Sequence, residues 1–481
     1  MPQPAPIPFT RPYVISWNLT YRCNLACEHC YLDAGGTPQV GTENFADRSE
    51  LGTEECFRVI DDIAGFAPEC LTILTGGEPL LRRDILEIVQ RAAERELWVV
   101  VGTNGVRITE NVARRLADAG ARGLSLSLDA LDADRHDRFR NVRGAWRNTV
   151  EGAAILGRTG LPFIVQTTAG SHNLHELEAI ADFAHDHLAA KVWNLYFLVP
   201  TGRGQFVSDM TPAQYDEVLA ALYRIQRKYD RRMLVNAKCA PHYIKTVLEE
   251  ATNGNGEETA ADDGASARPF GGLQRGPFAG PSFPGSSPIR TYSGGAGGCP
   301  AGTHYMGIRP NGDVTPCPYL PAFAGTLRSS SLADLWTSSE LFTDIRRRTS
   351  LGGRCGTCEM NAHCGGCRAR AYGMTGDVMA EDPLCTHTPG RFVGAPLLAE
   401  RGPASTSGPP WARTIQYGEE SPTTVDWDDA AAERMKKIPA FVRGMVVRAV
   451  EESCRRNGIS RVTADELERI RARMPTPKMF G

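Results

Sequence analysis

Three cysteines near the amino terminus form the most reactive group of side chains in the sequence. Cys23, Cys27 and Cys30 are spaced as C-x3-C-x2-C, just past a predicted strand. Three thiolates this close together can hold three irons of a cubic iron–sulfur cluster and leave the fourth iron without a protein ligand. A substrate or cosubstrate can bind that open iron. The alternative is a structural zinc site, but such sites use four ligands, usually in C-x2-C pairs, and no fourth ligand lies nearby in the sequence.

A glycine-rich segment, Thr-Gly-Gly-Glu-Pro at residues 75–79, follows the next predicted strand. Glycines allow the backbone to approach a ligand closely, although the segment taken alone would be an ordinary turn. Together with the triplet it resembles the signature of the radical S-adenosylmethionine (SAM) enzymes, in which the open iron chelates SAM. The resemblance implies that the three cysteines are catalytic and that Gly76, Gly77 and Glu78 bind the SAM amino group.

Other polar residues at the ends of predicted strands resemble positions that line the SAM cavity in this family. His29 stands where the family carries an aromatic residue beside the adenine. Either Arg140 or Arg143 could pair with the SAM carboxylate, because arginine suits bidentate carboxylate recognition, and Arg143 is our candidate. Each of these residues could instead be an ordinary turn, strand or surface residue. The remaining candidates are Asn104, Ser127, Asp129 and Gln166, with Thr168 beside Gln166 as a further possible contact to the ribose.

Seven more cysteines lie between residues 299 and 385, as C-x12-G-x4-C followed by C-x2-C-x5-C-x2-C-x17-C. This pattern resembles the SPASM extension of radical SAM enzymes, which houses auxiliary four-iron clusters, and a zinc ribbon is the alternative. It departs from many members, in which three residues separate the last close pair. The resemblance implies one cluster on Cys355, Cys358, Cys364 and Cys385 and a second on Cys299, Cys317 and Cys367. Cys239 or His304 could complete the second set, or its iron could be open to substrate.

Six strand-like segments alternate with amphipathic helical segments over the first two hundred residues. The pattern predicts an α/β fold with parallel strands and right-handed crossovers, either a doubly wound sheet or a partial barrel. In both folds the chemistry gathers at the carboxyl ends of the strands. The family resemblance implies a partial (β/α)6 barrel. The predicted strands are 13–18, 71–75, 98–103, 123–128, 163–168 and 192–198, and the predicted helices include 83–96, 110–119, 174–188 and 211–231.

Composition shifts divide the chain into five parts. The tail shows the apolar spacing of an amphipathic helix pair, and Trp427, Ile438, Phe441, Val442 and Val446 are its expected core. The tail resembles a small module at the end of a light-independent protochlorophyllide reductase subunit. The predicted parts are 1–235, the barrel; 236–298, a connecting segment with a flexible insert; 299–390, the auxiliary iron–sulfur domain; 391–424, a linker; and 425–481, a small helical domain.

Bulk properties exclude several classes of protein. A net charge of −3 gives no electrostatic footprint for nucleic acid. No apolar run reaches the length of a membrane span, and the amino terminus has no signal-like core, so we expect a cytoplasmic protein. Fourteen cysteines in a reducing compartment indicate metal ligation, not disulfides. Outside the two clusters, Cys56, Cys70 and Cys454 are expected to be buried as small hydrophobic residues.

The substrate is indicated by segments 197–204, 239–243 and 364–371, which resemble the radical SAM enzymes of haem biosynthesis. Those enzymes remove or oxidatively decarboxylate propionate side chains of iron-porphyrins or sirohaem derivatives. The resemblance implies a tetrapyrrole substrate, cleavage of SAM to a 5′-deoxyadenosyl radical, and an external low-potential electron donor. Arg203, Arg368 or Arg370 could clamp propionates, although each could also be a structural charge, and His242 or His304 could meet a porphyrin iron.

Two other functions compete with this interpretation. The first is a peptide-modifying radical SAM/SPASM maturase, whose substrate would be a ribosomally made precursor. Many such enzymes carry a winged-helix domain, and we expect the tail of this chain to lack the strands that such a domain needs. The second is a non-enzymatic iron–sulfur electron carrier, which would need neither residues 76–79 nor an incompletely ligated cluster.

Overall fold

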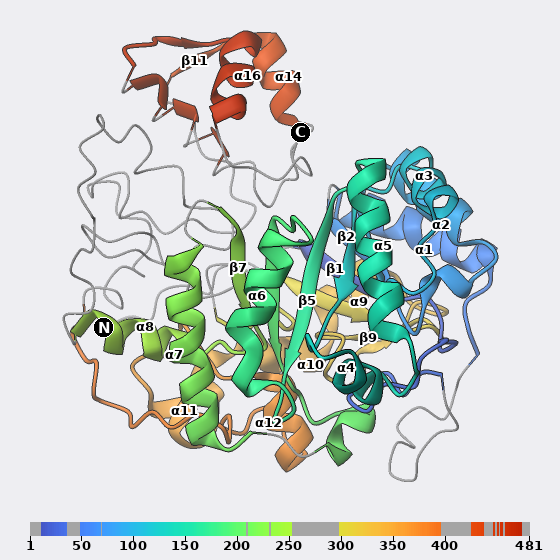
Figure 1. Ribbon diagram of the computed structural model, residues 1–481. Coiled ribbons are helices and arrows are strands. Elements are labelled where there is room, and N and C mark those ends of the chain that lie inside the picture. Colours follow the sequence, from blue (N-terminus) through green and yellow to red (C-terminus); the bar gives the residue numbers. More distant parts are fainter. Residues whose placement is uncertain are drawn as a thin grey trace.

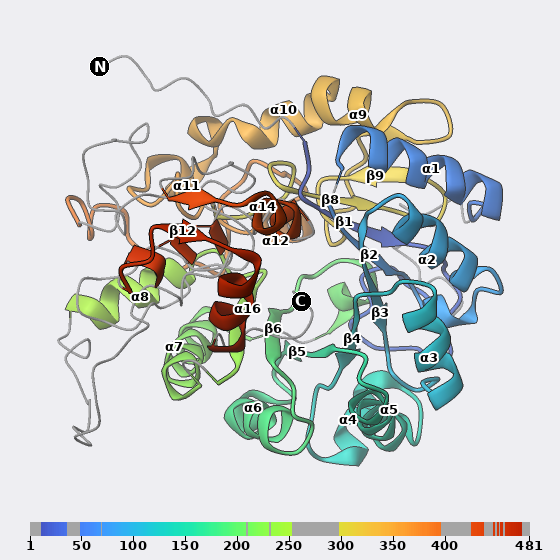
Figure 2. The ribbon, with the colours of Figure 1, turned by 90° about the horizontal axis from the view of Figure 1, so that it is seen from above.

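A ten-stranded sheet organises the main body of the molecule, in the order β10-β9-β8-β1-β2-β3-β4-β5-β6-β7. The computed structural model describes residues 11–35, 49–68, 70–207, 210–229, 232–252, 298–395, 425–436, 446–447, 450–451, 453–455 and 457–473. Figure 2 shows the sheet curved into an open barrel, with helices along its outer side. The predicted partial barrel is therefore confirmed.

Seven parallel strands form the barrel part of the sheet, and the six predicted ones are found within one residue of their expected bounds. The seventh, β7, was not predicted, and it lies across the domain boundary expected at residue 235. That boundary and those at 298, 390 and 424 stay predictions. The strands are β1 (Val14–Asn18), β2 (Leu71–Thr75), β3 (Trp98–Thr103), β4 (Gly123–Ser127), β5 (Phe163–Ala169), β6 (Val192–Phe197) and β7 (Leu234–Lys238).

Most of the outer helices bury an apolar stripe against the sheet. In α2 the buried residues are Ile85, Ile88, Val89 and Ala92, the spacing of one helical face. Segment 174–188 divides into a short 3-10 turn and α6, since its first residues form the turn η3 (Leu174–Glu176). The helices are α1 (Thr53–Phe66), α2 (Ile85–Glu94), α3 (Glu110–Asp118), α4 (Ala133–Arg140), α5 (Ala145–Thr159), α6 (Leu177–Asp186) and α7 (Pro212–Lys228).

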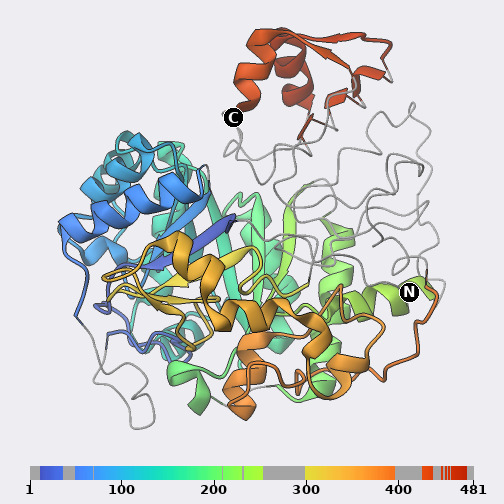
Figure 3. The ribbon, with the colours of Figure 1, turned by 180° about the vertical axis from the view of Figure 1, so that it is seen from behind.

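The cysteine-rich region continues the barrel sheet. Strand β8 (Tyr305–Ile308) pairs in parallel with β1, with Val14 opposite Tyr305. Strands β9 (Asp313–Thr315) and β10 (Gly325–Thr326) follow in antiparallel pairing. Figure 3 shows this region in yellow and orange, lying against the barrel. Helix α8 (Tyr243–Thr252) precedes this region. The helices of the region itself are α9 (Leu332–Ser338), α10 (Glu340–Arg346), α11 (Gly353–Thr357) and α12 (Arg368–Thr375).

The carboxyl-terminal unit, red in Figure 1, has a small core of its own that includes Val450, Cys454 and Val462. Trp427 and Val446 pack against it as predicted, while Ile438, Phe441 and Val442 lie outside the described residues. The expectation of helices alone was incomplete, because two short strands pair in parallel beside them. The elements are β11 (Asp426–Trp427), α14 (Asp429–Lys436), β12 (Arg461–Val462) and α16 (Ala464–Arg473).

The cysteines outside the two clusters behave as expected. Cys56, Cys70 and Cys454 are at most 3% exposed. All fourteen cysteines are free thiols. Among the described residues no helix is both long and apolar enough to cross a membrane.

Candidate active site and auxiliary cysteine sets

Cys23, Cys27 and Cys30 line one cavity, called here the triplet cavity, beside the carboxyl ends of the barrel strands. The loop that carries them follows β1. Parallel strands bring their carboxyl ends to the same edge, which is why residues far apart in the sequence meet here. The predicted residues that also line this cavity are His29, Gly76, Gly77, Asn104, Ser127, Gln166, Thr168 and Arg203.

The two glycines hold the triplet loop in place through the backbone. Gly77 N donates to Thr20 O at 2.7 Å, and Glu78 N donates to Arg22 O at 2.9 Å. A methyl carbon on Gly77 would lie 2.2 Å from Arg22 O, and Gly76 has a φ of +140°. Only glycine tolerates both this contact and this backbone conformation. The glycines therefore dock the cysteine loop as well as lining the cavity.

Glu78 has a different position from the one expected for a SAM ligand. It is fully buried, lies outside the lining of the triplet cavity, and accepts hydrogen bonds from Thr103 Oγ1 at 2.9 Å and Asn104 N at 2.9 Å. Burial raises the pKa of Glu78 to about 7. Its carboxylate joins the ends of β2 and β3, and its contact with the SAM amino group stays a prediction.

The three triplet sulfurs each accept a hydrogen bond. Donors near sulfur favour the thiolate form, which is the form that binds metal. Burial nevertheless raises the pKa of Cys23 to about 12, so the charge of a bound metal is needed to deprotonate it. The donors are Leu25 N to Cys23 Sγ at 3.4 Å, Ala34 N to Cys30 Sγ at 3.3 Å and Arg140 Nη1 to Cys27 Sγ at 3.6 Å.

Arg140, not Arg143, is the arginine at the end of α4 that lines the triplet cavity. Arg143 is exposed and lies outside this lining. Arg140 Nε donates to Asp129 Oδ2 at 2.7 Å, and Thr168 N donates to Asp129 Oδ1 at 2.8 Å. Burial raises the pKa of Asp129, but the Arg140 charge outweighs it and holds that pKa well below its usual range. Asp129 lies outside the lining too, so it positions Arg140.

His29 belongs to a stack of three rings. Its ring lies 4.2 Å from that of Phe139 at an interplanar angle of 1°, and Phe139 stacks in turn on His172 at 3.9 Å. Burial lowers the pKa of His29 to about 3, so the imidazole is neutral at neutral pH. His29 Nδ1 is buried without a hydrogen-bond partner among the described residues. A flat, neutral ring with a spare polar atom suits contact with a nucleobase.

Arg203, expected to clamp substrate, ties the triplet loop to the end of β6. Its Nε donates to Cys27 O at 2.9 Å, and its Nη1 donates to Asp33 Oδ1 and Ala34 O, both at 2.8 Å. Its Nη2 is buried and has no partner within the described part of the chain. Because Arg203 also lines the triplet cavity, that Nη2 is available to an anionic group bound there.

A second cavity, called here the apolar cavity, continues from the first along the barrel interior. Apolar strand residues such as Ile164 and Val192 make up much of its lining. Lys238 is its only lysine or arginine among the described residues, and none of those lining it is acidic. Burial lowers the pKa of Lys238 to about 8, so it still carries charge at neutral pH. Residues shared with the triplet cavity are Ile73, Ser125, Gln166, Tyr196, Tyr305 and Tyr319.

Four cysteines line the apolar cavity and are called here the proximal set: Cys239, Cys299, Cys317 and Cys367. His304 lines it as well, whereas His242 does not. Four others line a separate pocket and are called here the distal set: Cys355, Cys358, Cys364 and Cys385. The grouping of seven of these eight cysteines follows the division that the family resemblance implies.

Two residues expected at the substrate lie elsewhere. His242 is 1% exposed and lines the distal pocket, where its Nδ1 lies 3.8 Å from Asp382 Oδ2. Arg368 is fully buried, and its Nη1 donates to the carbonyls of Val378 at 2.9 Å and Ala380 at 2.6 Å. Both were expected there from the resemblance of segments 239–243 and 364–371 to haem-biosynthesis enzymes, and a resemblance of short segments does not show which cavity a side chain lines.

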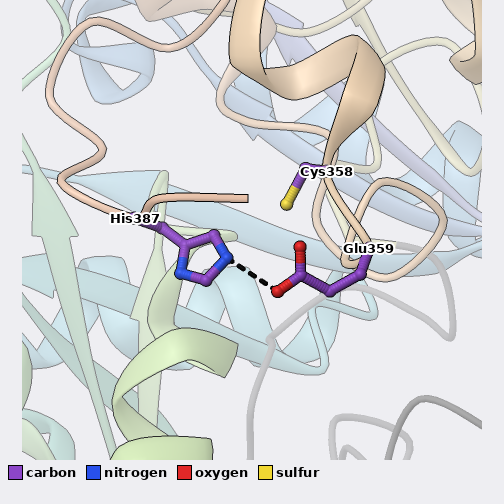
Figure 4. Close-up of side chains that lie close together, drawn as sticks. All are labelled: Cys358, Glu359 and His387. Atoms are coloured by element: carbon purple, nitrogen blue, oxygen red, sulfur yellow. Dashed lines mark hydrogen bonds and ion pairs between the residues drawn. The ribbon is translucent and has the colours of Figure 1, made fainter. Parts of the chain in front are cut away.

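Cys358, Glu359 and His387 lie close together beside the distal pocket, as Figure 4 shows. The Glu359 carboxylate accepts hydrogen bonds from His387 Nε2 at 2.9 Å, Gly390 N at 2.7 Å and Phe392 N at 2.9 Å. Burial raises the pKa of Glu359, but these donors outweigh it and lower that pKa to about 2. The Glu359 carboxylate therefore anchors residues 387–392, and these hydrogen bonds occupy the oxygen lone pairs that a separate metal ion would need.

The spacing of the thiols distinguishes clusters from zinc. Tetrahedral zinc with four thiolates places the sulfurs about 3.8 Å apart. Among the described residues no three cysteines have sulfurs that all lie within 4.8 Å of one another. Donor sets made only of thiols, spaced more widely than zinc requires, fit iron–sulfur clusters.

Family comparisons agree with this geometry. Residues 17–184 match the model of the radical SAM superfamily, and residues 299–367 match that of the SPASM iron–sulfur cluster-binding domain. The chain is 34% identical to an AdoMet-dependent heme synthase from Methanosarcina barkeri over 79% of its length, and the match covers 98% of that relative. The chain belongs to the radical SAM superfamily. A heme synthase from Nitratidesulfovibrio vulgaris is also 34% identical, with 79% of this chain and 94% of that protein covered.

More distant matches include a peptide-modifying enzyme, a solved structure and a family model for the carboxyl-terminal tail. The structure of Streptococcus suis SuiB bound to S-adenosylmethionine aligns with a TM-score of 0.57 over 79% of this chain and 78% of that one. At 16% identity, it shows the fold alone. The PqqA peptide cyclase of Granulibacter bethesdensis is 24% identical over 80% of this chain and 90% of that protein. Residues 427–471 match the proto-chlorophyllide reductase 57 kD subunit model.

Several site residues had gone unrecognised in the sequence. Lys238 was missed because β7 was not predicted, although the alternation over residues 234–238 is that of a strand with one polar face. Tyr196, Tyr305 and Tyr319 join the two cavities, and no sequence motif marked them.

Proposed function

We propose that the protein oxidatively decarboxylates propionate side chains of an iron-porphyrin, in a reaction started by SAM cleavage. The observation that carries this proposal is the apolar cavity, which joins the triplet cavity at one end and the proximal cysteines at the other. A flat apolar macrocycle with carboxylate arms suits a cavity with apolar walls and a single cation, Lys238. The heme synthase names of the most similar relatives support the same substrate class.

A hydrogen atom leaves the propionate carbon next to the ring and is taken up by the 5′-deoxyadenosyl group of cleaved SAM, which becomes 5′-deoxyadenosine. The carbon–carboxylate bond then breaks. The products are a vinyl group, carbon dioxide and one electron, which requires a one-electron acceptor of the iron–sulfur class. Thiols of the proximal set line the same cavity, so an acceptor held by them would border the substrate.

Different residues around the triplet cavity would bind the cluster and SAM. We infer that Cys23, Cys27 and Cys30 hold the cluster that, once loaded, supplies the reductive cleavage of SAM. His29 offers its ring stack to the adenine, and Arg203 Nη2 and Arg140 offer positive charge to the SAM carboxylate. Glu78 and Asp129 hold these groups in place.

The substrate would be held by other residues of the barrel interior. Lys238 binds a propionate through a charge-assisted hydrogen bond. His304 is the imidazole that lines the apolar cavity and is therefore the candidate to meet the porphyrin iron. We further propose that the protein works in the cytoplasm, where its fourteen free thiols stay reduced, and that an external low-potential protein donates the electron.

Titration of the anaerobically reconstituted protein with iron-coproporphyrin tests this proposal. We expect a shift of the Soret band on binding, and carbon dioxide and a vinyl product when SAM and a reductant are added. Absence of both binding and carbon dioxide release, with SAM cleavage intact, would refute the tetrapyrrole substrate. Modification of a short precursor peptide encoded nearby would then favour the peptide-maturase function.

A further inference from the structure

Cys239 stands well before the cysteine-rich region in sequence, but in the structure it lies among the cysteines of that region. It lines the apolar cavity together with Cys299, Cys317 and Cys367 and packs against the same small hydrophobic cluster. That cluster contains Cys299, Cys317 and Cys367 themselves, so Cys239 lies beside the other three cysteines. Four thiols therefore meet where the spacing motif supplied only three.

The backbone at Cys239 is held in an unusual conformation. Cys239 directly follows β7 with a φ of +60°, in the left-handed region that residues with a Cβ rarely adopt. Its carbonyl accepts a hydrogen bond from Arg370 Nη2 at 2.9 Å. Arg370 is fully buried and is itself fixed by Tyr215 Oη at 3.1 Å and Asp382 Oδ2 at 3.0 Å. A buried guanidinium thus maintains the turn that brings this thiol to the proximal set.

His304, the rival for the fourth position, is engaged differently. Its Nδ1 contacts Thr303 Oγ1 at 3.0 Å, and its ring stacks on Tyr13 with centroids 5.9 Å apart. Cys239, by contrast, packs against the hydrophobic cluster that contains Cys299, Cys317 and Cys367. Thiolates are also the usual ligands of four-iron clusters.

We propose that Cys239 is the fourth protein ligand of the proximal iron–sulfur cluster and closes it with four thiolates. The proposal goes beyond the proposed function and does not depend on the substrate. A cluster with four protein ligands has no open iron for substrate, so its role at the apolar cavity is to exchange electrons. Since Lys238 precedes Cys239 directly, the end of β7 would place both the substrate cation and the last ligand.

The test uses the full-length chain in which Cys23→Ala, Cys27→Ala and Cys30→Ala remove the open cluster. This parent should bind about eight irons per chain in two four-iron clusters. Cys239→Ala should lower the iron content and give a three-iron signal by electron paramagnetic resonance after oxidation. Cyanide or imidazole should change the spectrum of the reduced Cys239→Ala protein and leave that of the parent unchanged.

Two matched variants control for burial and for the rival ligand. Cys70→Ala removes another buried thiol, and His304→Ala removes the rival imidazole, and neither should alter iron content or the response to cyanide. If Cys239→Ala does not fold, Cys239→Ser serves in its place, and its spectrum should shift because oxygen replaces sulfur. The assignment would be overturned if the Cys239 variant had the same spectra and iron content as the parent. It would also be overturned if His304→Ala made the spectrum respond to cyanide. No tetrapyrrole is used, so a failed substrate proposal cannot affect the outcome.

Discussion

The triplet cavity and the distal pocket differ in the number of thiols that face one space. Three cysteines line the triplet cavity beside two guanidinium groups and a neutral imidazole, whereas four cysteines line the distal pocket, which is separate from the apolar cavity. Three thiols leave one iron for an exogenous ligand, and four leave none. The number of cysteine ligands and the neighbouring side chains therefore indicate that the triplet cavity is the site of SAM chemistry and that the distal pocket is a site of electron transfer.

Removing the triplet should have the largest effect and would test the comparison directly. Replacing Cys23, Cys27 and Cys30 by Ala should reduce 5′-deoxyadenosine formation to the detection limit, because no open iron remains for SAM. Chromatography of the quenched reaction measures it, and the absorbance of the remaining clusters should persist. Cys454→Ala, in the carboxyl-terminal unit, should leave both signals unchanged. Full 5′-deoxyadenosine production in the triple variant contradicts the assignment.

Disrupting the distal set should lower product formation while SAM cleavage continues. Cys364→Ala should lower carbon dioxide release by more than about tenfold, because an electron acceptor is lost while the triplet remains. The ratio of carbon dioxide to 5′-deoxyadenosine, measured in one reaction, reports this uncoupling. Continued SAM cleavage shows that the barrel is folded, and an unchanged ratio would show that the distal set is dispensable.

Substitution of Lys238 tests the role of the apolar cavity in binding the substrate. A hydrogen bond to a charged group contributes about 1.5–3 kcal/mol, so Lys238→Met should raise KM for iron-coproporphyrin about 10- to 150-fold. Steady-state kinetics should show a smaller change in kcat. Lys238→Arg should retain most of the affinity, and Arg143→Ala, an exposed cation, serves as the control. Equal KM values for Lys238→Met and the wild type would exclude the carboxylate contact.

The smallest expected effect concerns the ring stack of the triplet cavity. Aromatic pairs contribute about 0.5–1.5 kcal/mol beyond burial, so His29→Ala should weaken SAM binding about 2- to 13-fold. His29→Phe should bind nearly as well as the wild type, since it preserves the stack. Equilibrium dialysis of the cluster-loaded protein measures both. Equal affinity for the alanine and wild-type proteins would remove His29 from the site.

Local patterns predicted the six strands because each is a short apolar run bounded by turn residues. They could not predict that β8 pairs with β1, since the partners are Val14 and Tyr305, far apart in sequence. The sequence could not decide between Arg140 and Arg143 for a related reason: α4 ends at Arg140, and only the fold places that guanidinium in the lining of the triplet cavity. Cys239 likewise joins a set whose other members follow it by many residues.

The pairing of β8 with β1 has a consequence for how the protein is made. On the ribosome β1 can pair with β2 early, but its other edge has no partner until β8, which begins at residue 305, has left the exit tunnel. A chain released at residue 252 would keep an unpaired strand edge, which invites aggregation. The loop that carries Cys23, Cys27 and Cys30 follows β1 directly, so β8 of the cysteine-rich region supports the strand from which that loop starts.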